Sequence, residues 1–252
     1  MSDEILATRS GAILELRLNR PDKKNAITVA MYAALADAIE QAGADPAIRA
    51  VTIAGNGGLF TAGNDLGDFQ QSREGGPDMP VFRFLRAISS CPKIVICGVA
   101  GQAIGIGTTM LLHCDLVLAA RSALFSLPFV DLGLVPEAAS SLLLPRLIGR
   151  QRAARHLILA EPFDAETALR YGLVTEICEE DQLDLRLQDM ARRIAAKPPE
   201  AVMLAKRLIT STQASIPERM AEEGRMFDER LRSAEAKEAF AAFFEKRPPN
   251  FG

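Results

Sequence analysis

An uncharged run of 21 residues, 94–114, is the part of the sequence that most limits how the chain can fold. A run of this length is about what a helix needs to cross a bilayer. However, it contains four glycines, and glycine suits turns and close backbone contacts better than the middle of a helix. We therefore expect a buried strand, a glycine-rich turn and a buried helix, and no membrane span.

The composition is that of a chain with a substantial apolar core. The 252 residues are 48% hydrophobic and 24% charged, which excludes wholesale disorder. At about 100–200 residues per domain, this length fits one large domain or a domain with an appendage. The net charge of −3, the aromatic content of 6% and the absence of Trp argue against a nucleic-acid partner, which needs basic patches or stacking platforms.

The small number of cysteines and histidines limits which metal sites the chain can form and indicates the cellular compartment. The four cysteines contain no C-x-x-C pair and only two histidines occur, so neither a zinc site nor a secreted disulfide framework is expected. The acidic residues 1–4 lack the pattern of a signal peptide, and the C-terminal tripeptide is not a peroxisomal signal. We therefore expect a reducing, cytoplasmic location.

Hydrophobic periodicity predicts an α/β core in the first half of the chain. Residues 13–18 alternate apolar and polar side chains, as a half-buried strand does, and Thr28 can cap a helix that runs to about residue 42. Further strands are expected at residues 50–54, 94–97, 116–119 and 124–127, a turn region at 98–107, helices at 81–88 and 108–114, and a polar loop at 73–80. Strands that alternate with helices are typical of an α/β fold.

Beyond Ala138 the pattern is almost entirely helical. Helices are expected at residues 139–148, 151–159, 165–171, 182–196, 200–211, 218–232 and 235–246. The last two carry more apolar surface than an isolated helix pair should show, so they pack either on the parent domain or on a neighbouring subunit. We divide the chain into an α/β core at residues 1–196 and a helical C-terminal region at residues 197–252.

Three familiar catalytic and nucleotide-binding motifs are incomplete or absent. Gly58 and Gly63 have the spacing of a phosphate-binding loop, but Asn64 and Asp65 follow in place of Lys and Ser or Thr. Residues 105–110 lack the third glycine of a dinucleotide fingerprint, and no G-x-S-x-G nucleophile elbow occurs. The sequence therefore predicts neither a nucleotide site of these types nor a serine hydrolase.

Two glycine-rich segments, residues 58–66 and 101–107, each lead into a predicted helix. In the first, Asp65 can cap the helix that follows, which leaves the N–H of Asn64 pointing outward. In the second, the N–H of Ile106 lies near a helix N-terminus. Either cluster alone is as readily an ordinary turn. Two such N–H groups that converge on one point make an oxyanion hole.

Glu137 follows an apolar run and a proline, and we expect it at the start of a helix. It is either an acidic residue that complements the helix dipole, or a carboxylate among apolar side chains whose pKa is raised. The second interpretation would suit a general base. His113 is similarly ambiguous, since it fits either a buried core histidine or a residue near a ligand.

These segments together resemble the crotonase (enoyl-CoA hydratase/isomerase) superfamily, and the resemblance covers nearly the whole chain. The matching motifs are residues 19–26, 60–66, 101–107, 171–174, 197–199 and 244–247. The resemblance implies a spiral of ββα units with a helical C-terminal region used in trimerisation. It also implies an acyl-CoA thioester whose carbonyl accepts hydrogen bonds from the N–H groups of Asn64 and Ile106.

The same resemblance bears on the reaction. The positions that carry two water-activating glutamates in hydratases hold Thr109 and Phe129 here, and neither is a general base. Glu137 is similar to the single catalytic glutamate of peroxisomal-type Δ3,Δ2-enoyl-CoA isomerases. The resemblance therefore implies that Glu137 moves a proton from C2 to C4 of a 3-enoyl-CoA, as in fatty acid β-oxidation, without a metal or redox cofactor.

Coenzyme A is part of this substrate. The resemblance implies contacts with it from Ala62, Asp65 and Leu66 of the first loop, from Lys24, and across a subunit boundary from Phe243 and Lys246. Each lysine is alternatively a solvated surface charge. The implied partners are the acyl-CoA thioester and further copies of the chain, as a homotrimer or a dimer of trimers, with neither nucleic acid nor a membrane.

Two other functions stay open. A different crotonase reaction, such as hydration, thioester hydrolysis or dehalogenation, needs a water-holding group or a nucleophile, for which Asp68 and Asp131 are poor candidates. A non-catalytic acyl-CoA-binding or scaffold protein would keep the fold with a degenerate site. Tight binding of a CoA thioester without turnover would favour the non-catalytic protein.

Overall fold

The computed structural model describes residues 4–71, 79–211 and 216–251. Most of the polar loop expected at residues 73–80 lies outside this description. The chain forms two compact units, Met1–Ala191 and Arg192–Gly252. The boundary expected from the sequence, after residue 196, stands a few residues further along the chain.

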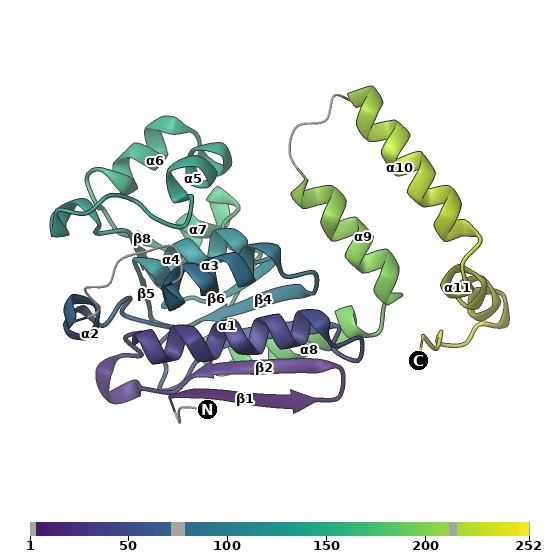
Figure 1. The fold of residues 1–252 in the computed structure, drawn as a ribbon, viewed down its shortest axis with the longest axis horizontal. Coiled ribbons are helices and arrows are strands. Elements are labelled where there is room, and N and C mark those ends of the chain that lie inside the picture. Colours follow the sequence, from purple (N-terminus) through teal and green to yellow (C-terminus); the bar gives the residue numbers. More distant parts are fainter. Residues whose placement is uncertain (1–3, 72–78, 212–215, 252) are drawn as a thin grey trace. The chain divides into compact units, whose positions relative to one another are not determined.

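A mixed six-stranded sheet lies at the centre of the first unit (Figure 1). Its strand order is β1-β2-β3-β4-β6-β9, with β1 antiparallel to β2 and all later neighbours parallel. The strands are β1 Ile5–Ser10, β2 Ile13–Leu18, β3 Ala50–Gly55, β4 Ile94–Val99, β6 Leu116–Ala120 and β9 Glu176–Cys178. Every residue of β4 is buried, as expected for an inner parallel strand.

A second sheet is built from three very short strands. They are β5 Gln102–Ile104, β7 Leu124–Ser126 and β8 Phe163–Asp164. β5 pairs in parallel with β7, and β7 pairs antiparallel with β8. The rings of Phe125 and Phe163 stack with centroids 5.4 Å apart, so apolar packing supports strands that are too short to be stable alone.

Helices pack around the sheets of the first unit. α1 Val29–Ala44 begins where predicted, because the Thr28 hydroxyl accepts the Met31 N–H at 3.2 Å. α1 packs on α3 Pro80–Ser90 (Figure 1), with the rings of Tyr32 and Phe84 5.5 Å apart. Also described are the helices α2 Leu66–Gln71, α4 Ile106–Thr109, α5 Ser140–Ile148, α6 Arg150–Leu157, α7 Ala165–Tyr171 and α8 Leu183–Ala195, and the 3-10 turns η1 Pro21–Lys23, η2 Met110–His113, η3 Val130–Leu132 and η4 Glu180–Gln182.

The second unit is helical. It contains α9 Pro199–Thr210, α10 Ile216–Leu231 and α11 Ala234–Glu245. Arg230 of α10 forms ion pairs with Glu200 of α9 and with Glu235 in the first turn of α11. In the single chain, Phe243 and Phe244 of α11 are 78% and 80% exposed. The packing of this apolar surface on a neighbouring subunit stays a prediction.

The α/β class predicted from the sequence is confirmed, but the uncharged run of residues 94–114 folds in more pieces than expected. β4 continues to Val99, and the expected turn region contains β5. The expected helix at 108–114 is instead α4 followed by the 3-10 turn η2, because the chain is already helical from Ile106. Among the residues described, none belongs to a helix with the length and apolar character that a membrane crossing requires.

Buried Asn25 joins the loop after β2 to the loop after β3. Its φ of +52° is left-handed, a conformation that Asn tolerates better than most residues. Its Oδ1 accepts the Arg20 N–H at 2.7 Å, and its Nδ2 donates to the carbonyls of Asn56 and Leu59 at 2.9 and 3.0 Å. One side chain thus satisfies three backbone groups that would otherwise lose their partners.

We expect Asn25→Ala to lower the free energy of unfolding by about 2–4 kcal/mol, because buried backbone groups are left without partners. Asn56→Ala is the control, since it removes a side-chain hydrogen bond to Asn19 and keeps the Asn56 carbonyl in place. This control should cost less than about 1 kcal/mol. Urea unfolding followed by circular dichroism measures both values, and equal losses would contradict the role of Asn25.

Candidate active site

Thr61 joins the two glycine-rich segments by backbone hydrogen bonds. Its N–H donates to the Gln102 carbonyl at 2.9 Å, and its carbonyl accepts the Ile104 N–H at 3.1 Å. These bonds form a parallel bridge between Thr61 and Ala103. The loop after β3 and strand β5 therefore run side by side, and the two sequence-predicted segments meet.

Two glycines permit this close approach. Gly63 has a φ of +91°, and a Cβ on it would lie 2.8 Å from the Ile104 carbonyl oxygen. A Cβ on Gly107 would lie 2.5 Å from Cγ2 of Thr61. Both distances are too short for a real side chain, so glycine is required at each position for the segments to meet in this way.

The backbone N–H groups of Asn64 and Ile106 remain available beside this contact. The Ile27 N–H donates to the Gly63 carbonyl at 2.8 Å and the Asp65 N–H donates to the Ile27 carbonyl at 3.0 Å, which turns the Asn64 N–H to the opposite side. Ile106 is the first residue of α4, so its N–H has no acceptor within the helix. Within the residues that the structure describes, neither N–H donates to another protein group.

The side chain of Asn64 is held by Tyr32. The Tyr32 hydroxyl donates to Oδ1 of Asn64 from the buried face of α1. Burial, and secondly the negative charge of Glu137, raise the pKa of the Tyr32 phenol, so the hydroxyl keeps its proton. Tyr32 therefore links the first loop to the surroundings of Glu137.

The sequence predicts Glu137 at the start of a helix, but the structure places it in the segment before α5. The reason is that α5 begins only at Ser140. Its carboxyl group is partly buried, and burial raises its pKa. The Thr109 hydroxyl donates to Oε1 at 2.5 Å and opposes this rise. A carboxyl group with a raised pKa is suited to proton transfer near neutral pH.

Asp65 has a structural role beside the first loop. Its carboxylate accepts hydrogen bonds from Arg20 at 2.7 Å and from the N–H groups of Gly67 and Asp68 at 3.1 and 3.2 Å. The Arg20 hydrogen bond is the main reason that the pKa of Asp65 is lowered. The carboxylate thus caps the start of α2, while the Leu66 side chain is exposed. Contact of either residue with coenzyme A stays a prediction.

Lys24 and Ala62 are neighbours through the backbone. The Ala62 N–H donates to the Lys24 carbonyl at 2.9 Å, and the Lys24 side chain is exposed. Lys24 therefore lies next to the first loop, to which Ala62 belongs. Phe243 and Lys246 belong to the second compact unit, where Lys246 ends α11 with a φ of +54°. Their contact with coenzyme A also stays a prediction.

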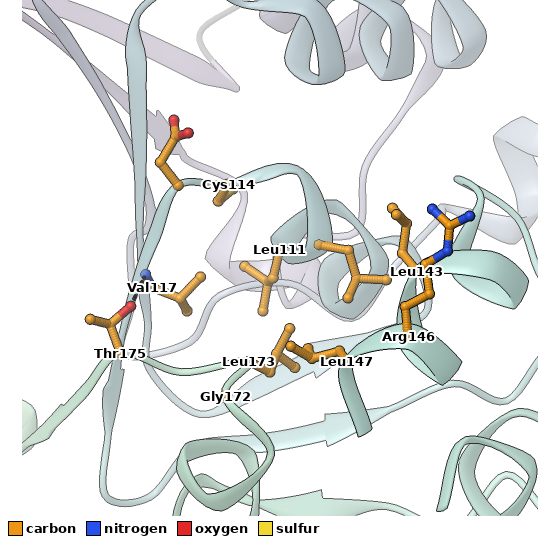
Figure 2. Close-up of a pocket in the computed structure, with 11 residues that line it drawn as sticks. Leu111, Cys114, Val117, Leu143, Arg146, Leu147, Gly172, Leu173 and Thr175 are labelled. Atoms are coloured by element: carbon orange, nitrogen blue, oxygen red, sulfur yellow. Dashed lines mark hydrogen bonds between the residues drawn. The ribbon is translucent and has the colours of Figure 1, made fainter. Parts of the chain in front are cut away.

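Figure 2 shows a cavity of about 350 Å³ in the first unit. Its wall comes from η2, α5 and the chain after α7, and includes Leu111, Leu143 and Leu173. None of the three residues Asn64, Ile106 and Glu137 lines it. The candidate site is therefore defined by the loops and the carboxyl group, not by this cavity.

The groups brought together can move a proton and stabilise negative charge. Glu137 supplies a carboxyl group of raised pKa, and Asn64 and Ile106 supply two backbone donors of the kind that stabilise an oxyanion. In the described part of the chain, no group of three or more His, Cys, Asp or Glu side chains gathers in a way that could hold a metal ion.

Residues 8–252 match the enoyl-CoA hydratase/isomerase family. The chain belongs to this family, the crotonase superfamily. The 1,2-epoxyphenylacetyl-CoA isomerase of Escherichia coli (strain K12) is 36% identical over 260 residues, which cover 100% of this chain and 99% of that protein. Enoyl-CoA delta isomerase 2 of Rattus norvegicus is 33% identical over 218 residues, which cover 84% of this chain and 56% of that protein.

The crotonase fold is confirmed by solved structures. The structure of an enoyl-CoA hydratase/carnithine racemase homologue from Magnetospirillum magneticum AMB-1 is 42% identical, with a TM-score of 0.97 over 100% of both chains. The family includes hydratases as well as isomerases, so membership establishes a crotonase-type enzyme that acts on an acyl-CoA. It leaves the particular reaction to be argued from the site.

The contacts of Thr109 and Tyr32 with the site of this crotonase are found only in the structure. Thr109 lies three residues after Ile106, so helical spacing could have placed both on one face. Tyr32 gives no comparable signal, because its hydroxyl reaches Asn64 only after α1 has packed.

We expect Thr109→Val to raise the pKa of Glu137 further, because the variant loses the hydrogen bond that opposes the effect of burial. A base works in its deprotonated form, so the acid limb of the kcat profile should move to higher pH. Thr109→Ser keeps the hydroxyl and should retain the parent profile. Rate measurements with an acyl-CoA substrate across the acid and neutral range compare the three proteins, and an unmoved limb in the Val variant would argue against the contact.

Proposed function

We propose that this crotonase converts 3-enoyl-CoA into 2-enoyl-CoA with Glu137 as its single base. The observation that carries the proposal is the partly buried Glu137 carboxyl group, whose pKa is raised and which Thr109 holds at 2.5 Å. The two positions that resemble the hydratase glutamates carry Thr109 and Phe129. Glu137 is thus the carboxylate that remains for acid–base chemistry.

On this mechanism the thioester carbonyl oxygen accepts hydrogen bonds from the N–H groups of Asn64 and Ile106. Glu137 removes a proton from C2, and the electron pair is delocalised to the thioester oxygen as a dienolate. The C4 carbon then takes the proton back from Glu137, and the double bond ends between C2 and C3. Each N–H donor is expected to stabilise the oxyanion by about 3–4 kcal/mol.

Phe129 favours return of the proton over hydration. The side chain is buried, and its Cε1 lies 4.0 Å from the position that a Cβ on Gly105 would take. An apolar ring so close to the start of α4 cannot hold a water molecule for attack on the substrate. The rat relative named enoyl-CoA delta isomerase 2 supports the same reaction, while the Escherichia coli relative is named for another isomerisation.

The side chains support the two alternatives, another crotonase reaction and a non-catalytic binding protein, less well than the isomerase. Asp68 accepts the Val29 N–H at 2.6 Å, and Asp131 is exposed in η3, so neither is set up to hold water or act as a nucleophile. A non-catalytic binding protein would not need a base of raised pKa beside two available N–H groups. The isomerase is therefore the function that the site supports best.

The proposal extends to the substrate's coenzyme A and to assembly. Ala62 lies along the nucleotide part, Lys24 contributes a phosphate contact, and Phe243 of α11 and Lys246, which follows α11, reach the site of a neighbouring subunit. The assembly is a homotrimer or a dimer of trimers in the cytoplasm. The exposed phenylalanines of α11 support a role in contact between subunits.

Glu137→Gln should lower kcat for 3-hexenoyl-CoA by about 10²–10⁴-fold, because a carboxamide cannot accept the C2 proton. The rise in ultraviolet absorbance of the conjugated thioester follows the reaction. Asp131→Asn is the matched control, since this exposed carboxylate lies on the same segment and has no assigned role. An unchanged rate in Glu137→Gln would reject Glu137 as the base, and a loss confined to Asp131→Asn would point to Asp131 in its place.

Lys24→Gln should weaken the binding of coenzyme A by about 3–10-fold at low salt, and less at high salt, because one exposed charge–phosphate contact is lost. Lys23→Gln removes a neighbouring exposed charge and should bind as the parent does. Calorimetric titration at two salt concentrations measures the affinities. Equal weakening by the two variants would mean that only the overall charge matters.

A further inference from the structure

We propose that His113 is a positioning residue for Glu137, an inference that rests on the proposed isomerase function. His113 ends η2, and its Nε2 lies 2.9 Å from the Ala138 carbonyl oxygen. A carbonyl oxygen can only accept, so Nε2 carries a hydrogen and donates it. The imidazole thereby holds the residue that directly follows the base.

The backbone after Glu137 needs such support. Ala138 and Ala139 have φ values of +52° and +54°, so two successive alanines adopt the left-handed conformation that residues with a Cβ rarely take. Strained residues of this kind persist only where the surroundings hold them, and they gather at functional sites. The conformation of this pair of residues therefore sets the orientation of Glu137 relative to α5, which begins at Ser140.

Ser140 holds the other side of the same turn. Its N–H and its hydroxyl both donate to the Glu137 carbonyl, at 2.9 and 2.6 Å. Since His113 binds the next carbonyl, two successive peptide groups are held by different elements, α5 and η2. Removal of the imidazole would release only the Ala138 group and allow the strained turn to relax.

The position of His113 in its helical segment connects it to the rest of the site. Ile106, Thr109 and His113 belong to one continuous stretch, α4 followed directly by η2. Ile106 offers the backbone donor, Thr109 holds the carboxylate, and His113 holds the turn behind it. A single short element, α4 with η2, therefore sets the distance from the base to the oxyanion donor. Small errors in such a distance reduce the rate strongly.

The test compares His113→Leu with His113→Gln. Both replacements are close in size, but only Gln carries an N–H donor that can reach the Ala138 carbonyl. We expect His113→Leu to lower kcat for 3-hexenoyl-CoA by about 10–100-fold, with KM within about threefold of the parent, because orientation of the base and not substrate binding is affected. His113→Gln should recover most of the lost kcat.

His156, the other histidine, provides a matched control. It is buried and contacts the Glu161 carbonyl through Nδ1 at 2.8 Å and the Tyr171 hydroxyl through Nε2 at 3.2 Å. Like His113 it binds a backbone carbonyl, but neither of these two partners belongs to the candidate site. His156→Gln should reduce thermal stability and leave kcat within about twofold of the parent.

The outcomes separate the two proposals. If the parent isomerises the substrate and Glu137→Gln does not, the proposed function stands. A His113→Leu variant with the parent's kcat then overturns the positioning role alone, as does a loss that His113→Gln fails to recover. If His113→Leu does not fold, a parent-like kcat in His113→Ala overturns the role. A parent without isomerase activity overturns both proposals.

Discussion

The geometry of the site depends on the buried residue Thr61. Its backbone forms hydrogen bonds with both ends of β5. Its hydroxyl donates to the Asn25 carbonyl at 2.6 Å and accepts the Gly63 N–H at 3.1 Å. Its methyl group fills the space that Gly107 leaves without a side chain. One residue therefore sets the spacing of the loop that contains Asn64, the start of α4 and the loop after β2.

The small second sheet fixes the position of β5, the strand that leads to Ile106. β5 pairs with Thr61 on one side and with β7 on the other, so its end has little freedom. The Gly105 N–H donates to the Ser126 carbonyl at 2.9 Å, and the Thr108 hydroxyl donates to the Ala103 carbonyl at 2.5 Å. These bonds fix where the chain changes from strand to helix. The available N–H of Ile106 is a direct result of that change.

Elements with a local signal could be predicted from the sequence, and elements that depend on distant pairing could not. The alternation in β2 and the cap at Thr28 are encoded within a few residues, and both are found where expected. β5, β8 and β9 have two or three residues each and exist only through their neighbours in the sheets. The same reason explains the position of Glu137: the left-handed turn that follows it, at Ala138 and Ala139, is held by His113 from a segment 25 residues away.

The hydroxyl of Thr109 suits a base that must exist in two protonation states. On the proposed mechanism Glu137 is a carboxylate before C2 deprotonation and a carboxylic acid before proton return. A hydroxyl group can donate to the first form and, after rotation, accept from the second. A second glutamate at position 109 would repel the carboxylate and offer a site for water. On the proposed mechanism, a hydroxyl in place of a carboxylate at position 109 therefore favours return of the proton to carbon over activation of water.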